Sequence, residues 1–167
     1  HAGEGGGDRI SFTPPTPRPT CTLSINPSTI NEGQDATLSW TTRYATSVRI
    51  NPIGSVALSG SRTIHPLQTK TFTLYATGSG GSVTCSKTIT VIPLPVPTCM
   101  LAVMPSSITA GQSAVLSWTS TNATSGTISS IGSVALNGSQ NVSPQQTTMY
   151  VATFTGPGGS ATCSKTL

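Results

Sequence analysis

The sequence predicts an all-β protein made of two antiparallel β-sandwich domains in tandem. Three observations predict this. The chain repeats itself, and apolar residues in each copy recur at every second position. Charged residues are few, and Ser, Thr and Gly are abundant in their place. Only 7% of residues are charged, against roughly 25% in typical soluble domains. β-Branched residues fit a pleated strand better than a helix, because their χ1 freedom is restricted. We therefore expect strands and turns rather than helices.

The repeat sets the domain organisation. Two cysteines and a tryptophan recur at one constant offset: Cys21, Trp40 and Cys85 match Cys99, Trp118 and Cys163. Residues 21–89 align with 99–167 without a gap, and about half of the paired positions are identical. We expect domain 1 at 20–92, domain 2 at 99–167, and between them a spacer at 93–98, "PLPVPT". Alternating prolines cannot continue a hydrogen-bonded ladder, so this spacer is expected to be extended and stiff.

Within each copy, apolar and polar residues alternate, which indicates strands. Seven short strands are expected in the first copy, with these apolar residues in order: Cys21, Leu23 and Ile25; Ala36, Leu38 and Trp40; Val48 and Ile50; Val56 and Leu58; Ile64; Phe72, Leu74 and Ala76; Val83, Cys85, Ile89 and Val91. The second copy follows the same plan, with Tyr150, Ala152 and Phe154 in its sixth strand. Short strands separated by turn signals are typical of a small antiparallel β-sandwich.

Segments in both copies resemble a known family. "CTLSINPSTINEGQDATLSWTT", "ATSVRI", "GSVALSG" and "GSGGSVTCSKTITV" are similar to the tandem bacterial-type immunoglobulin-like repeats of prokaryotic cell-surface and secreted proteins. The resemblance covers about 21–92 and 99–167. It implies immunoglobulin-like domains that serve as spacers, adhesin stalks or filament subunits, and it implies no active site.

The four cysteines are predicted to form two disulfides, Cys21 with Cys85 and Cys99 with Cys163. In such a sandwich the first strand can lie parallel beside the last, which brings the two strand starts together. This arrangement would differ from antibody domains, whose disulfide crosses between the sheets. Each bond would close a loop of about 65 residues, worth about 4 kcal/mol in the chain-entropy model. Paired cysteines favour an extracellular location, and buried free thiols are the alternative.

The distribution of titratable groups argues against an enzyme. All four acidic residues lie near the start of the chain: Glu4, Asp8, Glu32 and Asp35. Domain 2 has a single charged side chain, Lys165, and no histidine, so it lacks a general acid or base. His65 is expected to be an exposed turn residue, and with His1 it forms no metal-ligand spacing. We expect no catalytic residue, no metal and no cofactor.

Neither nucleic acid nor a membrane is an expected partner. The net charge of +4 comes from basic residues that stand singly, whereas a nucleic-acid surface needs them clustered. No stretch approaches the roughly 18 consecutive apolar residues of a membrane span.

Glycans are possible in two roles. Asn122, Asn137 and Asn141 match the N-x-[ST] acceptor pattern, although chance matches are common in a chain rich in Ser and Thr. A module that binds glycans or a host surface would need exposed aromatic side chains, and the sequence offers few beyond Tyr44 and Tyr75.

The leader, residues 1–19, begins with a glycine-rich segment that is expected to be a flexible tail. In "RISFT", Arg9–Thr13, Ile10 and Phe12 lie on one face of a candidate β-strand, and prolines end it. This strand has no partner in its own repeat.

Domain 2 is expected to lack the end of its last strand. Leu167 aligns with Ile89, so nothing matches residues 90–92. The hypothesis is an extracellular filament or pilus-like appendage, in which the leader strand of one subunit joins domain 2 of the next, head to tail. The alternatives are a disordered leader with a naturally short last strand, or a fragment of a longer adhesin stalk or ligand-binding surface protein.

Overall fold

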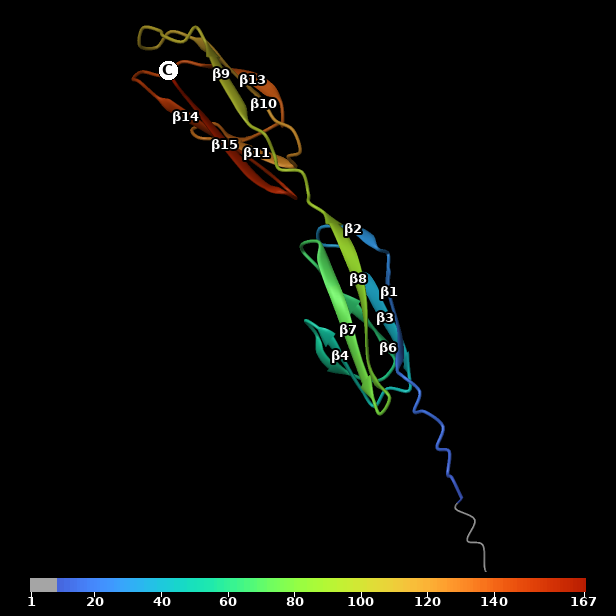
Figure 1. Ribbon diagram of the computed structural model, residues 1–167. Helices are drawn as coiled ribbons and strands as arrows, with labels where there is room; N and C mark the ends of the chain where they lie inside the picture. Colours follow the sequence, from blue (N-terminus) through green and yellow to red (C-terminus); the bar gives the residue numbers. More distant parts are fainter. Residues whose placement is uncertain (1–8) are drawn as a thin grey trace, which may run out of the picture. The chain divides into compact units, whose positions relative to one another are not determined.

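The computed structural model describes residues 9–167, which form strands and loops without a helix (Figure 1). The all-β fold class is therefore confirmed. The chain divides into two compact units, His1–Ile92 and Pro93–Leu167. The predicted glycine-rich tail lies outside the described residues.

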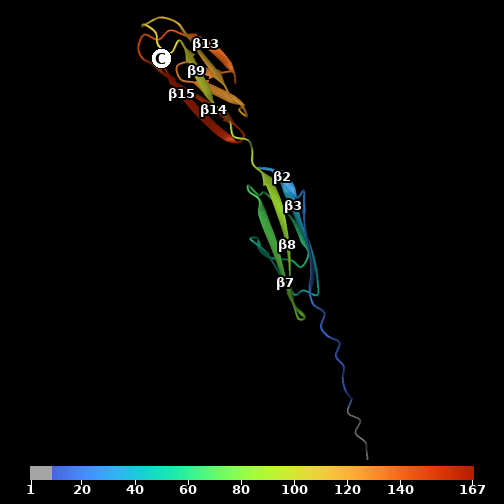
Figure 2. The same ribbon diagram turned by 45° about the horizontal axis from the view of Figure 1, so that its top comes forward.

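The described part of unit 1, residues 9–92, contains eight strands in two sheets (Figures 1 and 2). The strands are β1 (Thr20–Asn26), β2 (Thr29–Asn31), β3 (Ala36–Arg43), β4 (Ser47–Asn51), β5 (Gly54–Val56), β6 (Gly60–Ile64), β7 (Lys70–Gly78) and β8 (Gly81–Ile92). One sheet has the order β1-β3-β6, and the other has the order β2-β8-β7-β4-β5. Neighbours are antiparallel except β2 and β8, which are parallel. The sequence did not predict β2, because its three residues contain only one apolar side chain, Ile30.

The N-terminal strand of unit 1 is divided between the two sheets. β1 pairs with β3, whereas β2 pairs with the end of β8. Two backbone bonds frame the β2–β8 ladder: Thr90 N donates to Ser28 O at 2.9 Å, and Glu32 N donates to Ile92 O at 2.9 Å. The sheet of β1, β3 and β6 thus faces the sheet that contains β8, β7 and β4. Strands are distributed in this way in immunoglobulin-like sandwiches, and unit 1 has this fold.

Unit 2 has the same plan with one strand fewer. Its strands are β9 (Met100–Met104), β10 (Ala114–Thr119), β11 (Ser125–Ile128), β12 (Gly132–Val134), β13 (Gly138–Val142), β14 (Met149–Gly156) and β15 (Gly159–Thr166). The sheets are β9-β10-β13 and β12-β11-β14-β15, and every pair is antiparallel. Residues 105–113 contain no counterpart of β2. β15 is therefore an edge strand along its whole length.

The cores contain most of the predicted residues. Phe72, Leu74 and Ala76 are buried in unit 1, as are Tyr150, Ala152 and Phe154 in unit 2. Leu58 was expected in a strand but is 44% exposed, because β5 ends at Val56 and the chain leaves the sheet there.

The two cores use different side chains at one matched contact. Unit 1 has Val48 opposite Ala76, and unit 2 has Gly126 opposite Phe154. A Cβ atom on Gly126 would lie 2.4 Å from Cε1 of Phe154. The glycine therefore provides the space that the phenylalanine ring fills.

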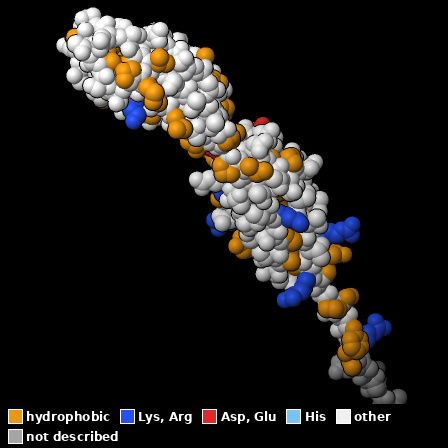
Figure 3. All heavy atoms as spheres, turned by 90° about the horizontal axis from the view of Figure 1, so that it is seen from above, with side chains coloured by type: hydrophobic (Ala, Val, Ile, Leu, Met, Phe, Trp, Pro, Cys, Tyr) orange, Lys and Arg blue, Asp and Glu red, His pale blue; other side chains and the backbone are white. Residues whose placement is uncertain are grey.

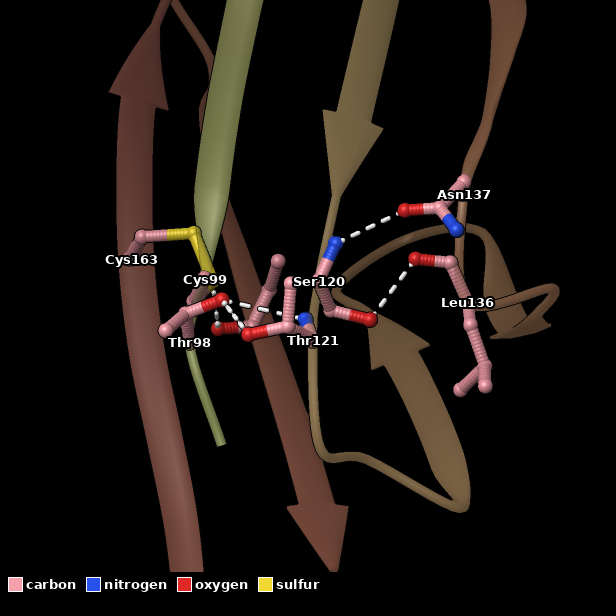
Figure 4. Close-up of a disulfide and its surroundings, with 8 residues drawn as sticks. Thr98, Cys99, Ser120, Thr121, Leu136, Asn137 and Cys163 are labelled. Carbon is pink, nitrogen blue, oxygen red and sulfur yellow. Dashed lines mark hydrogen bonds between the residues drawn. A yellow bond between two sulfur atoms is a disulfide. The ribbon is translucent and has the colours of Figure 1, made fainter. Parts of the chain in front are cut away.

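The repeated "GSVAL" motif is held by hydrogen bonds to its backbone. In unit 1, Trp40 Nε1 donates to Ala57 O at 2.9 Å. The counterpart bond in unit 2 runs from Trp118 Nε1 to Ala135 O at 2.8 Å. Next to it, Ser120 Oγ donates to Leu136 O at 2.8 Å (Figure 4). These bonds satisfy the polar groups of side chains that pack in or beside the core.

Both predicted disulfides are present, Cys21–Cys85 and Cys99–Cys163, but their position corrects one expectation. Cys21 lies on β1 and Cys85 on β8, and these strands belong to different sheets. Each bond therefore crosses between the sheets, at their edges (Figure 4). The starts of the two strands do meet, but the N-terminal segment joins the sheet of β8 only at β2.

Candidate functional site

The end of β8 closes one end of the core of unit 1. Val91 is 7% exposed, and its neighbours Ile30 and Ile89 are 3% and 0% exposed. Val91 N also donates to Thr69 Oγ1 at 2.9 Å. Residues 90–92 are therefore held on one side by β2 and on the other by the loop before β7.

At the matching place, unit 2 has an open groove of about 230 Å³. Its lining residues are Ile108, Ala110, Pro144, Gln146, Thr147 and Leu167. Ile108 and Leu167 are half-buried, whereas their counterparts Ile30 and Ile89 are fully covered. Among residues 9–167, no charged side chain lines the groove, and its lining combines the apolar Ile108 and Leu167 with the polar Gln146 and Thr147.

Three polar atoms beside the groove match those that hold residues 90–92 in unit 1. Ser106 O, Ala110 N and Thr147 Oγ1 are the counterparts of Ser28 O, Glu32 N and Thr69 Oγ1. Within residues 9–167 none of the three unit 2 atoms has a hydrogen-bond partner.

The backbone beside the groove already has a defined conformation. Thr109 N donates to Gln112 Oε1 at 3.1 Å, as Asn31 N donates to Gln34 Oε1 at 2.9 Å in unit 1. Gly111 N also bonds Pro144 O at 3.0 Å, which ties the turn to the opposite wall of the groove. These bonds hold the turn at residues 109–112 beside the groove.

The groove lies at the end of an exposed sheet edge. β15 is eight residues long, and its only charged side chain is Lys165. An unpaired strand edge can pair with another chain, and proteins usually protect such edges with several charges, prolines or bulges. This edge has little of that protection. Figure 3 shows the same contrast in charge, with Lys and Arg side chains over unit 1 and few on the visible face of unit 2.

The leader splits into a docked part and an exposed part. A Cβ atom on Gly80 would lie 2.2 Å from Pro17 O, so the backbone from Thr16 onward packs against the β7–β8 turn. Ile10 and Phe12 are 76% and 88% exposed, and residues 9–13 form no strand within their own chain. Strand formation by this segment stays a prediction.

The three candidate glycosylation sites are exposed on unit 2. Asn122 Nδ2 donates to Val96 O at 3.2 Å. Asn137 Oδ1 accepts a bond from Ser120 N at 2.9 Å, which leaves its amide nitrogen free (Figure 4). Asn141 lies on β13, and its side chain makes no hydrogen bond to another of the described residues. Asn137 and Asn141 can therefore be modified without breaking a bond to the amide nitrogen.

A second hollow lies on the outer face of β4, β5 and β7 in unit 1. It has a volume of about 430 Å³, and its lining includes Arg49, Asn51 and Tyr75. Tyr44 is also exposed but does not line this hollow. No sequence pattern indicated this grouping, because it depends on which strands pair.

The outer face of β9 and β10 in unit 2 is apolar. Met100, Met104 and Val115 are 70%, 77% and 44% exposed. Their counterparts in unit 1 are polar: Thr22, Asn26 and Thr37. This exposed face distinguishes the two repeats.

Titratable groups form one small cluster in the described part of the chain. His65 Nδ1 contacts Asp35 Oδ1, and both side chains are more than half exposed. The predicted exposure of His65 is confirmed, but the partner was not foreseen. Residues 9–167 contain no group of three or more His, Cys, Asp or Glu side chains that could hold a metal ion. Within the same residues, no helix has the length and apolar character of a membrane span.

Comparisons with known proteins find similar structures but no matching sequence. No family model and no curated protein sequence matches the chain. Titin domains Z1Z2 in complex with telethonin are similar at a TM-score of 0.40 and 14% identity, over 89% of this chain and 94% of that chain. Murine CEACAM1b is similar at a TM-score of 0.36 and 14% identity, over 89% of this chain and 98% of that chain. The N-terminal four immunoglobulin domains of Dscam1 isoform 1.9 give a TM-score of 0.30 and 12% identity, over 86% and 44%. At such scores the fold assignment rests on strand order and register.

Proposed function

We propose that this protein is a non-enzymatic structural subunit of an extracellular filament or pilus-like surface appendage. Subunits assemble head to tail, and Arg9–Thr13 of one copy adds a strand to unit 2 of the next. The groove of unit 2 carries the proposal, because it lies where unit 1 places residues 90–92, and because the matching hydrogen-bonding atoms have no partner among residues 9–167. The resemblance of both repeats to bacterial-type immunoglobulin-like modules supports a place on a cell surface.

The polarity of the contact favours a filament. The donor lies at the start of the chain and the acceptor in unit 2, so each subunit uses two different surfaces. Such a heterologous contact propagates unless its rotation happens to close a ring. Two disulfides suit an extracellular setting, and the nearly uncharged unit 2 opposes association only weakly.

Burial of apolar surface is the main source of binding free energy. A large apolar side chain on the donated strand contributes roughly 1.5–3 kcal/mol when it is fully buried. Each added backbone hydrogen bond contributes about 0.5–1.5 kcal/mol net. The strand also covers Ile108 and Leu167, which are half-buried in the free subunit.

The test is a charge change on the apolar face of the leader. Ile10→Asp with Phe12→Asp would replace the apolar face of the donated strand with unpaired carboxylates, so fibres should not form. The control is Ser11→Asp with Thr13→Asp, which adds the same charge on the opposite face and should leave assembly largely intact. Negative-stain electron microscopy counts fibres, and thermal unfolding checks that each variant stays folded.

Normal fibres from the Ile10 and Phe12 variant would refute donation by this segment. Assembly would then need side-to-side contacts, for which the apolar face of β9 and β10 is available. If this variant were already unfolded at the temperature of the assembly assay, the leader would have to pack on its own chain.

A sugar-binding adhesin module is the second candidate. It is supported by the hollow that groups Tyr75 with Arg49 and Asn51 on one sheet face. A glycan-array signal that Tyr75→Ala abolishes, from protein that stays monomeric at high concentration, would favour this function over the filament.

A further inference from the structure

The leader repeats the sequence that ends β8. "ISFTP", Ile10–Pro14, parallels "ITVIP", Ile89–Pro93: isoleucine, a hydroxyl residue, an apolar residue, one further residue and proline. Alternating prolines follow in both, "PTPRPTC" after Pro14 and "LPVPTC" after Pro93. The leader is one residue longer before the cysteine. The parallel stops at Ile10, because "GGDR" does not match the "CSKT" that precedes Ile89.

We infer that Ser11–Thr13 takes, in unit 2 of the next copy, the places that Thr90–Ile92 hold in unit 1. This inference rests on the proposed function and adds its register. Phe12 then stands at the position of Val91, the buried residue of that segment.

The register assigns a partner to each unpaired atom beside the groove. By analogy with unit 1, Ser11 N donates to Ser106 O and Phe12 N donates to Thr147 Oγ1. Ala110 N donates to Thr13 O, as Glu32 N donates to Ile92 O. Phe12 fills the groove, which has apolar walls from Ile108 and Leu167.

The same register excludes Ile10 from the core. Its counterpart is Ile89, and in unit 2 that place is already taken by Leu167. Leu167 exchanges two backbone bonds with Thr148, at 2.8 and 2.9 Å, as a strand residue does. Ile10 must therefore leave the sheet where Ser11 enters it. Phe12 is the anchor, and Ile10 contributes much less.

The residues that follow the donor strand resemble the proline spacer that follows β8. Pro14 takes the role of Pro93. Further on, the carbonyl of Pro17 lies against Gly80 just as the carbonyl of Pro95 lies against Gly158. A Cβ atom added to Gly80 or Gly158 would lie 2.2 or 2.3 Å from the carbonyl oxygen. The segment that enters unit 1 is thus docked like the segment that enters unit 2. In the polymer, one proline spacer would join each unit to the strand that completes the sheet of the preceding unit.

The test compares single changes in the leader of the full chain. Phe12→Asp should raise the critical concentration for assembly by roughly 100-fold or more, because a carboxylate would lie against Ile108 and Leu167 in a groove that, among the described residues, offers it no cation. Ile10→Asp should raise it by less than about 10-fold. A larger effect of Ile10→Asp than of Phe12→Asp would overturn the register while leaving strand donation in place.

A second arm fills the groove from the same chain. Appending Thr-Val-Ile after Leu167 supplies the residues of Thr90–Ile92 and should keep the protein monomeric although its leader is intact. The matched extension Thr-Asp-Ile should still assemble. If the Thr-Val-Ile chain forms fibres as readily as the unextended chain, the groove is not the acceptor and the inference is wrong. Absence of fibres from the unextended chain would instead refute the proposed function.

Discussion

Thr69 and Thr147 occupy matched positions in the two repeats, and replacing each with valine should have opposite consequences. In unit 1 the Thr69 hydroxyl accepts the bond from Val91 N at 2.9 Å. In unit 2 Thr147 lines the groove, and its hydroxyl has no partner among the described residues. Valine keeps the shape of threonine and removes only the hydrogen-bonding oxygen.

The magnitude follows from the backbone donor that loses its partner. A hydrogen bond contributes about 0.5–1.5 kcal/mol net, and a buried donor left unsatisfied costs about 1–3 kcal/mol. Thr69→Val should therefore lower the stability of unit 1 by about 1–2 kcal/mol. A change of 1 kcal/mol shifts Tm by roughly 4–8 °C in a domain of this size. Thr147→Val should leave the Tm of the monomer unchanged and raise the critical concentration for assembly about tenfold.

Differential scanning calorimetry in the Phe12→Asp background measures the first effect without assembly. Sedimentation of the otherwise unaltered chain measures the second. If Thr147→Val lowers the monomer Tm as much as Thr69→Val does, Thr147 already supports its own unit. If it leaves the critical concentration unchanged, the hydroxyl does not receive the donated strand.

Three further changes test the fold and the surface. Replacing Cys21 and Cys85 with alanine should cost about 2–5 kcal/mol of unit 1 stability, measured by denaturant unfolding, and leave unit 2 unchanged; equal losses in both units would contradict the independence of their cores. Gly126→Val should destabilise unit 2 by about 1–3 kcal/mol through overpacking against Phe154. Adding Phe154→Ala should restore part of that loss by recreating the Val48–Ala76 pair of unit 1, and a purely additive loss would show that the two sites are not coupled. In material from its natural source, mass spectrometry of glycopeptides should find any N-linked glycan on Asn137 or Asn141 rather than Asn122, whose amide nitrogen is engaged.

Much of the fold could be predicted from the sequence because alternation directly reports which side chains face inward. The alternating residues of β3 and β7, such as Leu38 and Leu74, are buried as expected. The pairing of the cysteines was predicted because each copy has one cysteine at the start of its first strand and one near the start of its last. Alternation does not say which strand lies alongside, however, so the sheet that contains β1 was not foreseen. β2 was missed because Ile30 alone gives no period.

The candidate site was only partly predictable. Alignment of Leu167 with Ile89 directed attention to the place in unit 2 that residues 90–92 occupy in unit 1. The atoms that a donated strand would bind are Ser106 O, Ala110 N and Thr147 Oγ1. They could be identified only from the bonds that Thr90–Ile92 make in unit 1. The register of the leader depends on the same bonds, because either Ile10 or Phe12 satisfies the alternating pattern.

The most direct measurement is an electron cryo-microscopy map of the assembled material at side-chain resolution. We expect a short strand in the groove of unit 2, parallel to residues 107–109, with an aromatic side chain between Ile108 and Leu167. That strand should continue through Pro14 into unit 1 of another copy. An empty groove, or one filled by residues that follow Leu167 in the same chain, would contradict assembly by strand donation.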